Sequence, residues 1–138
     1  MKSLIWLIAL VFIVACTDKP KAAVQLDKKL QLPLKCLNLN TIDIDKAYKK
    51  RLESLYIFDK NCMFHLDVSY KKDIVCNSSY NSMAKSTGKF PKSFLKLEVR
   101  KGFDTKYSYY IDLLDNVQSD DVEVAFRRLK NDILSEQQ

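Results

Sequence analysis

The sequence predicts an α+β domain in which helices pack on one face of a mainly antiparallel sheet. Several segments alternate apolar and polar residues with the period of a β-strand, and two others place apolar residues at helical spacing. Only two glycines and three prolines occur in 138 residues, which argues against a disordered chain and against glycine-rich nucleotide-binding loops. The expected order of elements is β-α-β-β-β-β-α.

The first strand and the first helix are expected between residues 29 and 58. The segment KLQLPLKCLNL, residues 29–39, alternates leucines with polar residues, and Pro33 removes a backbone donor, so that an edge strand is predicted. Residues 42–58 carry an apolar stripe at helical spacing, with Thr41 or Asp43 as the candidate N-cap. The stripe consists of Ile44, Tyr48, Leu52 and Leu55.

The centre of the chain is expected to form four strands. The segment CMFHLDVSY, residues 62–70, alternates strictly, and residues 74–80 follow it as a short return strand. Residues 93–100 and 106–114 are two strong strand signals on either side of Lys-Gly-Phe-Asp at 101–104, which predicts a hairpin.

The chain ends in a predicted helix that Ser119 caps, with two acidic residues in the first turn to complement the helix dipole. Its apolar stripe consists of Val122, Phe126, Leu129 and Ile133. Residues 30–138 are assigned to a single domain, which is long enough to bury a core without metals or many disulfides.

The N-terminus, MKSLIWLIALVFIVAC, has the pattern of a secretory signal. Lys2 supplies the positive start, residues 4–14 are apolar and uncharged, and the small residue Ala15 precedes Cys16. A membrane-spanning helix needs about 20 apolar residues, and this run is shorter and is followed at once by polar residues. Residues 1–15 are therefore predicted to be a signal peptide.

The end of this segment, Ile13-Val14-Ala15-Cys16, resembles the lipobox of bacterial lipoproteins. The resemblance implies that the sulfur of Cys16 carries a diacylglycerol, that cleavage follows Ala15, and that the new amino group is acylated. Two or more acyl chains anchor a protein stably to a membrane, whereas one binds only marginally. The alternatives are an uncleaved signal anchor and an ordinary signal peptide with a chance cysteine.

Residues 16–29, rich in Lys, Ala and Asp, are expected to be the lipidated cysteine and a flexible tether. Thr17 follows the cysteine, and the absence of Asp there is similar to lipoproteins that enteric bacteria send to the outer membrane. The expected location is thus the cell envelope, more specifically the outer membrane facing the periplasm.

Three further cysteines predict one disulfide and one free thiol in an oxidising compartment. If the chain turns at residues 71–73, Cys62 and Cys76 lie about 20 Å apart along the hairpin, which is beyond disulfide reach. Cys36 and Cys76 both occupy positions of their predicted strands that point inward, so the predicted disulfide is Cys36–Cys76.

Catalytic and metal chemistry find little support. Cys62 and His65, with Cys36 and Cys76, could form a zinc site, but residues three apart on a strand point to opposite faces. His65 is the only histidine, and no Cys-x-x-Cys, Gly-x-Ser-x-Gly or phosphate-binding loop occurs. We therefore expect no catalytic residues, no metal and no cofactor, and we do not expect an enzyme.

The segment between residues 89 and 110 mixes basic and aromatic residues in a chain of net charge +6. On the outward face of the predicted hairpin, a basic-aromatic patch is expected from Lys96, Arg100, Lys106 and Tyr110. Such a patch suits anionic lipid headgroups or an acidic protein partner. The alternative is an ordinary solvated sheet face, and nucleic acid is not an expected partner outside the inner membrane.

These features predict a membrane-anchored lipoprotein that acts as a binding or assembly module, an adaptor, in the cell envelope. An exposed edge at residues 30–39 offers a second way to bind, by pairing with a partner's strand. The alternative function is a carrier of lipid or a small ligand, with a pocket between sheet and helices. A deep apolar pocket would favour the carrier, and a charged surface or a free edge would favour the adaptor.

Overall fold

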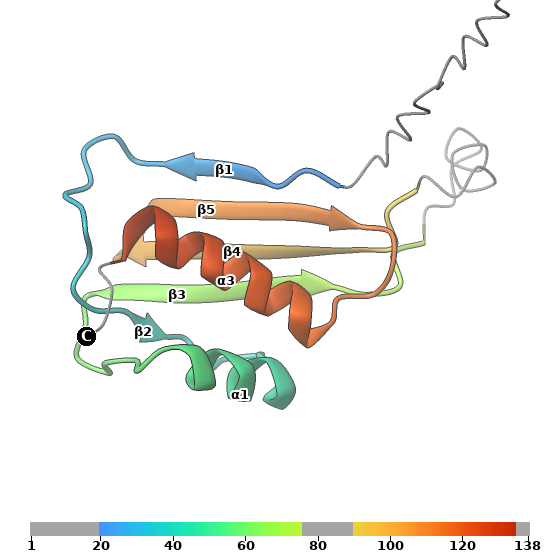
Figure 1. Cartoon of the computed structure of the whole chain (residues 1–138), viewed down its shortest axis with the longest axis horizontal. Helices are drawn as coiled ribbons and strands as arrows, with labels where there is room; N and C mark the ends of the chain where they lie inside the picture. Colours follow the sequence, from blue (N-terminus) through green and yellow to red (C-terminus); the bar gives the residue numbers. More distant parts are fainter. Residues whose placement is uncertain (1–19, 76–89, 135–138) are drawn as a thin grey trace, which may run out of the picture.

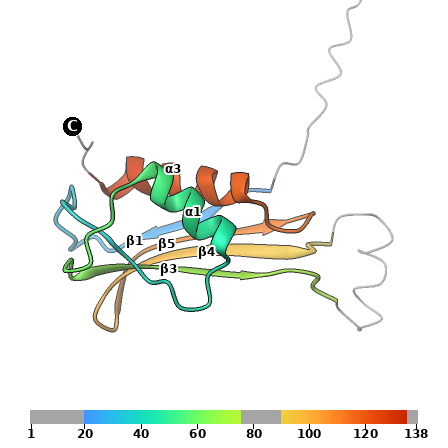
Figure 2. The same cartoon turned by 90° about the horizontal axis from the view of Figure 1, so that it is seen from below.

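The chain folds into one sheet whose one face is covered by two helices (Figures 1 and 2). The computed structural model describes residues 20–75 and 90–134. The sheet has five strands in the order β1-β5-β4-β3-β2, and every neighbouring pair is antiparallel except β2 and β3. The predicted α+β class, with a mainly antiparallel sheet and helices on one face, is confirmed.

The strands are β1 Ala23–Leu26, β2 Asn38–Leu39, β3 Phe64–Lys71, β4 Ser93–Lys101 and β5 Asp104–Leu113. The helices are α1 Lys46–Leu55 and α3 Ser119–Ile133. In the described part of the chain, no helix has both the length and the apolar character needed to cross a bilayer.

The hairpin of β4 and β5 is the centre of the sheet, and it forms where the sequence predicts it. Gly102 lies in the turn with φ +60°, a left-handed conformation that glycine adopts without steric cost. Along β4, Leu95, Leu97 and Val99 point toward the helices and are fully buried, while Lys96 on the other face is partly exposed. The alternation in the sequence therefore sets which face meets the core.

The segment expected to be a tether contains a strand, which corrects the prediction for residues 16–29. Ala23 to Leu26 pair with Tyr110 to Tyr107 of β5, because β5 would otherwise be an unpaired edge. The predicted signal peptide, Cys16 and residues 17–19 lie outside the described residues.

The strand predicted over residues 29–39 is much shorter than expected. Only Asn38–Leu39 form β2, at the outer edge of the sheet as predicted, but parallel to β3. Residues 29–36 instead cross the end of the sheet, because Leu34 turns inward and its N–H donates to the carbonyl of Ile133 at 2.7 Å. Of the short strand predicted over 74–80, residues 74 and 75 are irregular and the rest lie outside the described residues.

The core fills the space between the sheet and the two helices. The side chains exposed by 1% or less include Leu37, Leu52, Leu66, Leu95, Leu97, Val99, Tyr107, Val122, Phe126, Leu129 and Ile133. All four residues of the apolar stripe predicted for the last helix are among them. Their burial supplies the main favourable term in folding.

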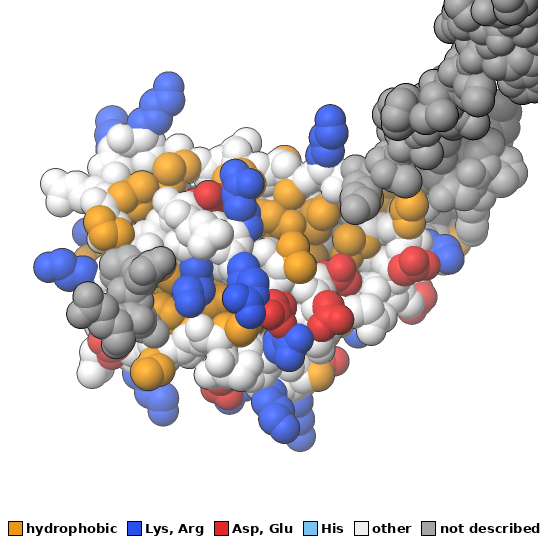
Figure 3. Space-filling view, viewed as in Figure 1, with side chains coloured by type: hydrophobic (Ala, Val, Ile, Leu, Met, Phe, Trp, Pro, Cys, Tyr) orange, Lys and Arg blue, Asp and Glu red, His pale blue; other side chains and the backbone are white. Residues whose placement is uncertain are grey.

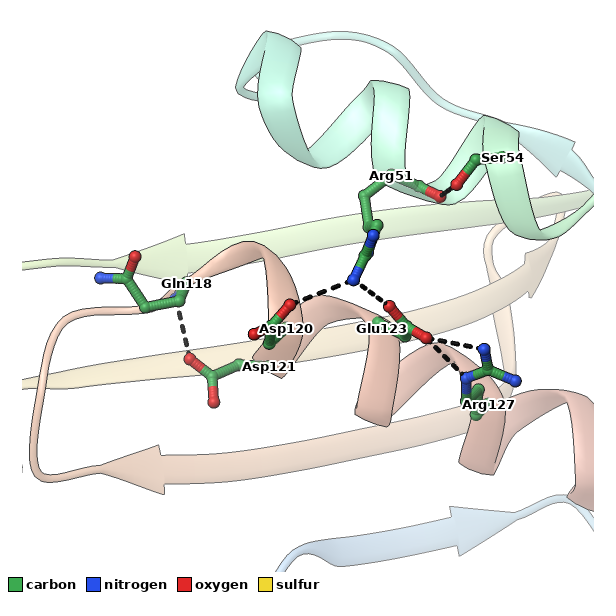
Figure 4. A network of polar contacts seen from close by, with 7 residues as sticks. All are labelled: Arg51, Ser54, Gln118, Asp120, Asp121, Glu123 and Arg127. Atoms are coloured by element: carbon green, nitrogen blue, oxygen red, sulfur yellow. Dashed lines mark hydrogen bonds and ion pairs between the residues drawn. The ribbon is translucent and has the colours of Figure 1, made fainter.

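A polar network joins α1 to α3 on the surface of the helical layer (Figure 4). Arg51 of α1 donates to Asp120 at 3.1 Å and also pairs with Glu123, both on α3. Arg127 binds the same Glu123, and together these cations hold the pKa of its carboxyl below the ordinary value. The N-cap of α3 is Gln118, one residue before the predicted Ser119, and its N–H donates to Asp121.

Helix α1 is capped two residues after Asp43 and four after Thr41, the two predicted N-caps. Its N-cap is Asp45, whose carboxylate accepts from the N–H of Ala47 at 2.8 Å, whereas Thr41 and Asp43 lie in the preceding loop.

Candidate functional site

Three of the four residues predicted to form the basic-aromatic patch lie together on the outer face of the sheet. Lys96 lies directly opposite Tyr110 across β4 and β5, and Arg100 lies further along β4 on the same face. Lys106 is set apart from them, because a register shift between Val99 and Arg100 leaves it unpaired with β4. It lies at the β1 side of the hairpin, where its ammonium contacts Asp27.

The outer face carries mixed charge, because each of these residues has an acidic neighbour. Lys96 pairs with Glu98 at 2.8 Å, and Arg100 is 4.0 Å from Asp67. The hydroxyl of Tyr110 donates to Asp112 at 2.7 Å, and this bond raises the pKa of the tyrosine. A surface with this arrangement attracts anions far less than an unbalanced basic patch would.

The disulfide joins Cys36 to Cys62, so the predicted pairing of Cys36 with Cys76 is wrong. The parallel pairing of β2 with β3 sets Asn38 beside His65, so that Cys36, two residues before Asn38, lies within one residue of the level of Cys62. Knowing which cysteines point inward does not reveal a pairing that depends on which strands are neighbours in the sheet. Cys76 lies outside the described residues.

A groove lies at the end of the sheet where β3 begins and β4 turns into β5; we call it the end groove. One wall is the segment of residues 29–36, and the other contains Met63, Phe64, Lys101, Asp104 and Lys106. Its volume of about 930 Å³ is at the upper end of the range of ligand-binding pockets. Figure 3 shows hydrophobic and basic side chains side by side at this end of the molecule, on the left.

Apolar side chains line the groove while remaining in contact with solvent. Leu32 is 44% exposed and Met63 is 57% exposed, and Pro33 and Phe64 also belong to the lining. Phe103, at the tip of the adjacent hairpin, is 97% exposed. Exposed apolar groups gathered at one place in a soluble domain commonly mark a binding surface.

The charges of the groove are predominantly positive. Among the described residues no carboxylate lies within 4 Å of the ammonium groups of Lys29, Lys35 or Lys101. The ammonium of Lys101 lies 5.7 Å from the centre of the Phe64 ring, which is cation–π distance. The charge of Lys106 is balanced by two carboxylates, because Asp27 lies 2.9 Å and Asp104 3.8 Å from its nitrogen.

The wall formed by residues 29–36 is fixed at several points. The N–H of Leu30 donates to the carbonyl of Asp27, the N–H of Leu34 donates to Ile133, and the disulfide holds Cys36. A site that is ordered before it binds loses less conformational entropy on binding. The groove is therefore a preformed feature of the fold.

A second hollow, of about 570 Å³, lies on the outer side of β3. Asp43, Asp67 and Glu98 contribute acidic groups to its lining and Arg100 a basic one. Asn40 donates to Asp67 at 2.7 Å across it, so much of its polar capacity is already used.

Sequence reasoning missed the end groove because it assigned the whole of KLQLPLK to a strand. The available signal was the lysines that flank the leucines on both sides of Pro33, since an edge strand that contains proline readily becomes a loop. Of the four residues predicted for the basic-aromatic patch, only Lys106 lines the groove, and residues 30–36 of the edge predicted to pair with a partner's strand line it as well.

The groove combines an apolar lining with unpaired cations, which suits a ligand that carries both apolar and anionic groups. Two of the four candidate zinc ligands, Cys36 and Cys62, are joined in the disulfide and are not available as thiolates. In comparisons with protein-family models, curated proteins and solved structures, nothing matches this chain.

Proposed function

We propose that this chain is a lipid-anchored, non-catalytic binding module of the bacterial cell envelope, held on the outer membrane and facing the periplasm, and that it binds its partner in the end groove. The lipobox resemblance at Ile13–Cys16 supports the anchor. The observation that carries the binding role is a set of lysines, Lys29, Lys35 and Lys101, that have no carboxylate of the described residues within 4 Å and surround solvent-exposed apolar side chains.

The place where the chain from the predicted anchor joins the sheet supports a groove that is directed away from the membrane. The tether that remains before β1 is residues 17–22. Ala23, the first residue of β1, pairs with Tyr110, whereas the groove residues Lys101 and Asp104 lie at the turn of the hairpin. Figure 1 shows that β1 begins at one end of the sheet and runs toward the other. The connecting residues 17–22 can span at most about 20 Å when fully extended.

The alternative function, a carrier with a pocket between the sheet and the helices, gains no support from the packing. Leu97 of the sheet and Phe126 and Leu129 of α3 are fully buried, and side chains like these fill the space that such a ligand would occupy. The second route proposed for an adaptor, strand pairing at residues 30–39, is reduced to the two residues of β2.

The anchor is tested by replacing Cys16 with serine. The wild-type protein should incorporate a labelled fatty acid and sediment with outer membranes, whereas Cys16→Ser should lose both properties because no thiol is left to acylate. A Cys16→Ser protein that still incorporates the label would contradict the proposed lipidation.

The binding role is tested in intact cells with a photocrosslinking amino acid at one of two positions. Position 32 lies in the end groove, and position 108 lies on the outer face of the sheet. A specific crosslink to an envelope protein from position 32, and none from position 108, is the expected result. Equal crosslinking from both positions would show that the groove has no special role.

A further inference from the structure

We propose that the partner presents to the end groove an extended peptide segment in which acidic and apolar side chains alternate. This inference rests on the proposed binding role of the groove and adds the chemistry of what is bound.

The acidic character of the segment follows from the placement of the lysines. Lys29 and Lys35 belong to one wall and Lys101 to the other, so that cations flank a bound peptide on both sides. Among the described residues, Asp104 is the only carboxylate that lines the groove, and it is 3.8 Å from Lys106. A groove whose described lining holds more cations than carboxylates is complementary to an anionic ligand.

The apolar character follows from the lining between those cations. Leu32 and Met63 are about half exposed, and a purely acidic ligand would leave their surface in contact with water. Methionine is unbranched and adapts its shape to different apolar side chains. The bound segment therefore carries apolar groups between its carboxylates.

The extended form of the segment follows from the shape of the groove. Its walls are an irregular segment on one side and the starts and ends of strands on the other, and its apolar lining remains open to solvent. An extended chain places alternate side chains on opposite sides, so that one set can reach the lining while the other reaches the lysines of the walls.

A peptide is favoured over an anionic membrane because of where the groove lies. The tether enters at the opposite end of the sheet, so the membrane that holds the protein is at the far end from Lys101 and Lys35. A protein in the periplasm can reach the groove without any reorientation of the domain.

The test uses the full chain with Cys16→Ser, which removes the acyl chains, and three fluorescent synthetic peptides. The first is Glu-Leu-Asp-Phe-Glu-Leu-Asp, the second replaces its acids by Gln and Asn, and the third replaces its apolar residues by Ser. The first should bind about tenfold more tightly than either of the others in fluorescence anisotropy. Its binding should weaken with salt, because exposed charges are screened over about 8 Å at physiological ionic strength.

A charge-neutralised groove provides the matched comparison. The triple variant Lys29→Gln, Lys35→Gln, Lys101→Gln should lose about tenfold in affinity for the first peptide. The control variant removes the same charge from exposed lysines outside the groove, with Lys46→Gln, Lys50→Gln and Lys71→Gln, and should bind as the parent does. Both variants should keep the thermal midpoint of the parent, since exposed charges contribute little to stability.

An equal loss of affinity for the first peptide in the two triple variants would overturn the inference, because the peptide would then be attracted by the overall charge of the protein and not by the groove. Binding to phosphatidylglycerol vesicles through the groove lysines, without preference among the peptides, would replace the peptide by an anionic membrane. If no peptide binds while the crosslink from position 32 still forms in cells, the peptide chemistry is wrong and the binding role stands.

Discussion

The ammonium of Lys106 and the carboxylate of Asp27 form an ion pair of 2.9 Å that joins the edge strand to the central hairpin. The backbone reinforces it, because the N–H of Asp27 donates to the carbonyl of Lys106, also at 2.9 Å. The hydrogen bond from Lys106 lowers the pKa of Asp27 below its ordinary value of 3.8, and the same bond raises the pKa of Lys106 above 10.5.

This pair predicts a pH window for the docking of β1. The Asp27 contribution is fully present above pH 3.8 and is lost as the pH falls through the lowered pKa; the Lys106 contribution is lost as the pH rises through its raised pKa. The stability difference between the wild type and Lys106→Gln should therefore be constant at neutral pH and shrink at both extremes. Urea denaturation across the pH range measures it, and a difference that grows in acid would contradict the pairing.

The disulfide predicts a specific peptide map and a loss of stability. Non-reduced digestion should give a single fragment that links Cys36 to Cys62, and Cys76→Ser should leave that fragment intact. For two cysteines 26 residues apart, the chain-entropy account gives a loss of about 3.5 kcal/mol when Cys36 and Cys62 are both replaced by alanine. A fragment that links Cys36 to Cys76 would show the structure to be wrong at this point.

Tyr48→Phe tests a buried hydrogen bond between helix α1 and the segment before α3. The hydroxyl of Tyr48 donates to the carbonyl of Val117 at 2.7 Å, and both residues are buried. Removing the donor leaves a buried carbonyl unpaired, which costs about 1–3 kcal/mol of unfolding free energy. Tyr110→Phe, which removes a hydroxyl bound to a surface carboxylate, is the control and should cost less.

Adjacent residues of β4 should differ sharply in their tolerance of alanine. Leu97 is fully buried against the helices, so Leu97→Ala should cost about 2–5 kcal/mol through lost burial and a cavity. Lys96 lies on the outer face and pairs with an acid in the same strand, so Lys96→Ala should cost less than about 1 kcal/mol. Similar losses for both would contradict the alternation of faces.

The sequence predicts the elements whose signal is long. Strands β3, β4 and β5 each alternate over eight residues or more, and α3 repeats its apolar stripe over four turns. β1 cannot be predicted in this way, because it has only four residues between lysine-rich flanks. Only two of them, Val24 and Leu26, occupy inward positions, which is too short an alternation to recognise. Its formation depends on the free edge of β5, which is a property of the whole sheet.

The groove and the disulfide could not be predicted from the sequence for a related reason, since both depend on contacts between segments that are distant in the sequence. The wall at residues 29–36 is shaped by contact with Ile133 at the other end of the domain, and Cys62 reaches Cys36 through a parallel pairing of two residues. The individual lysines of the groove are visible in the sequence, but their convergence is not.

The direction of β1 has a mechanical consequence. In the proposed arrangement, with a membrane anchor at one end of the strand and a partner at the other, a pull between the two acts along the strands. The hydrogen bonds between Ala23–Leu26 and β5 are then loaded in shear, so that they resist together, whereas a pull across the sheet would break them one after another. The ion pair of Asp27 with Lys106 adds its resistance at the far end of the same ladder. For a domain held by the proposed anchor, the short edge strand is the element through which tension from the anchor enters the domain.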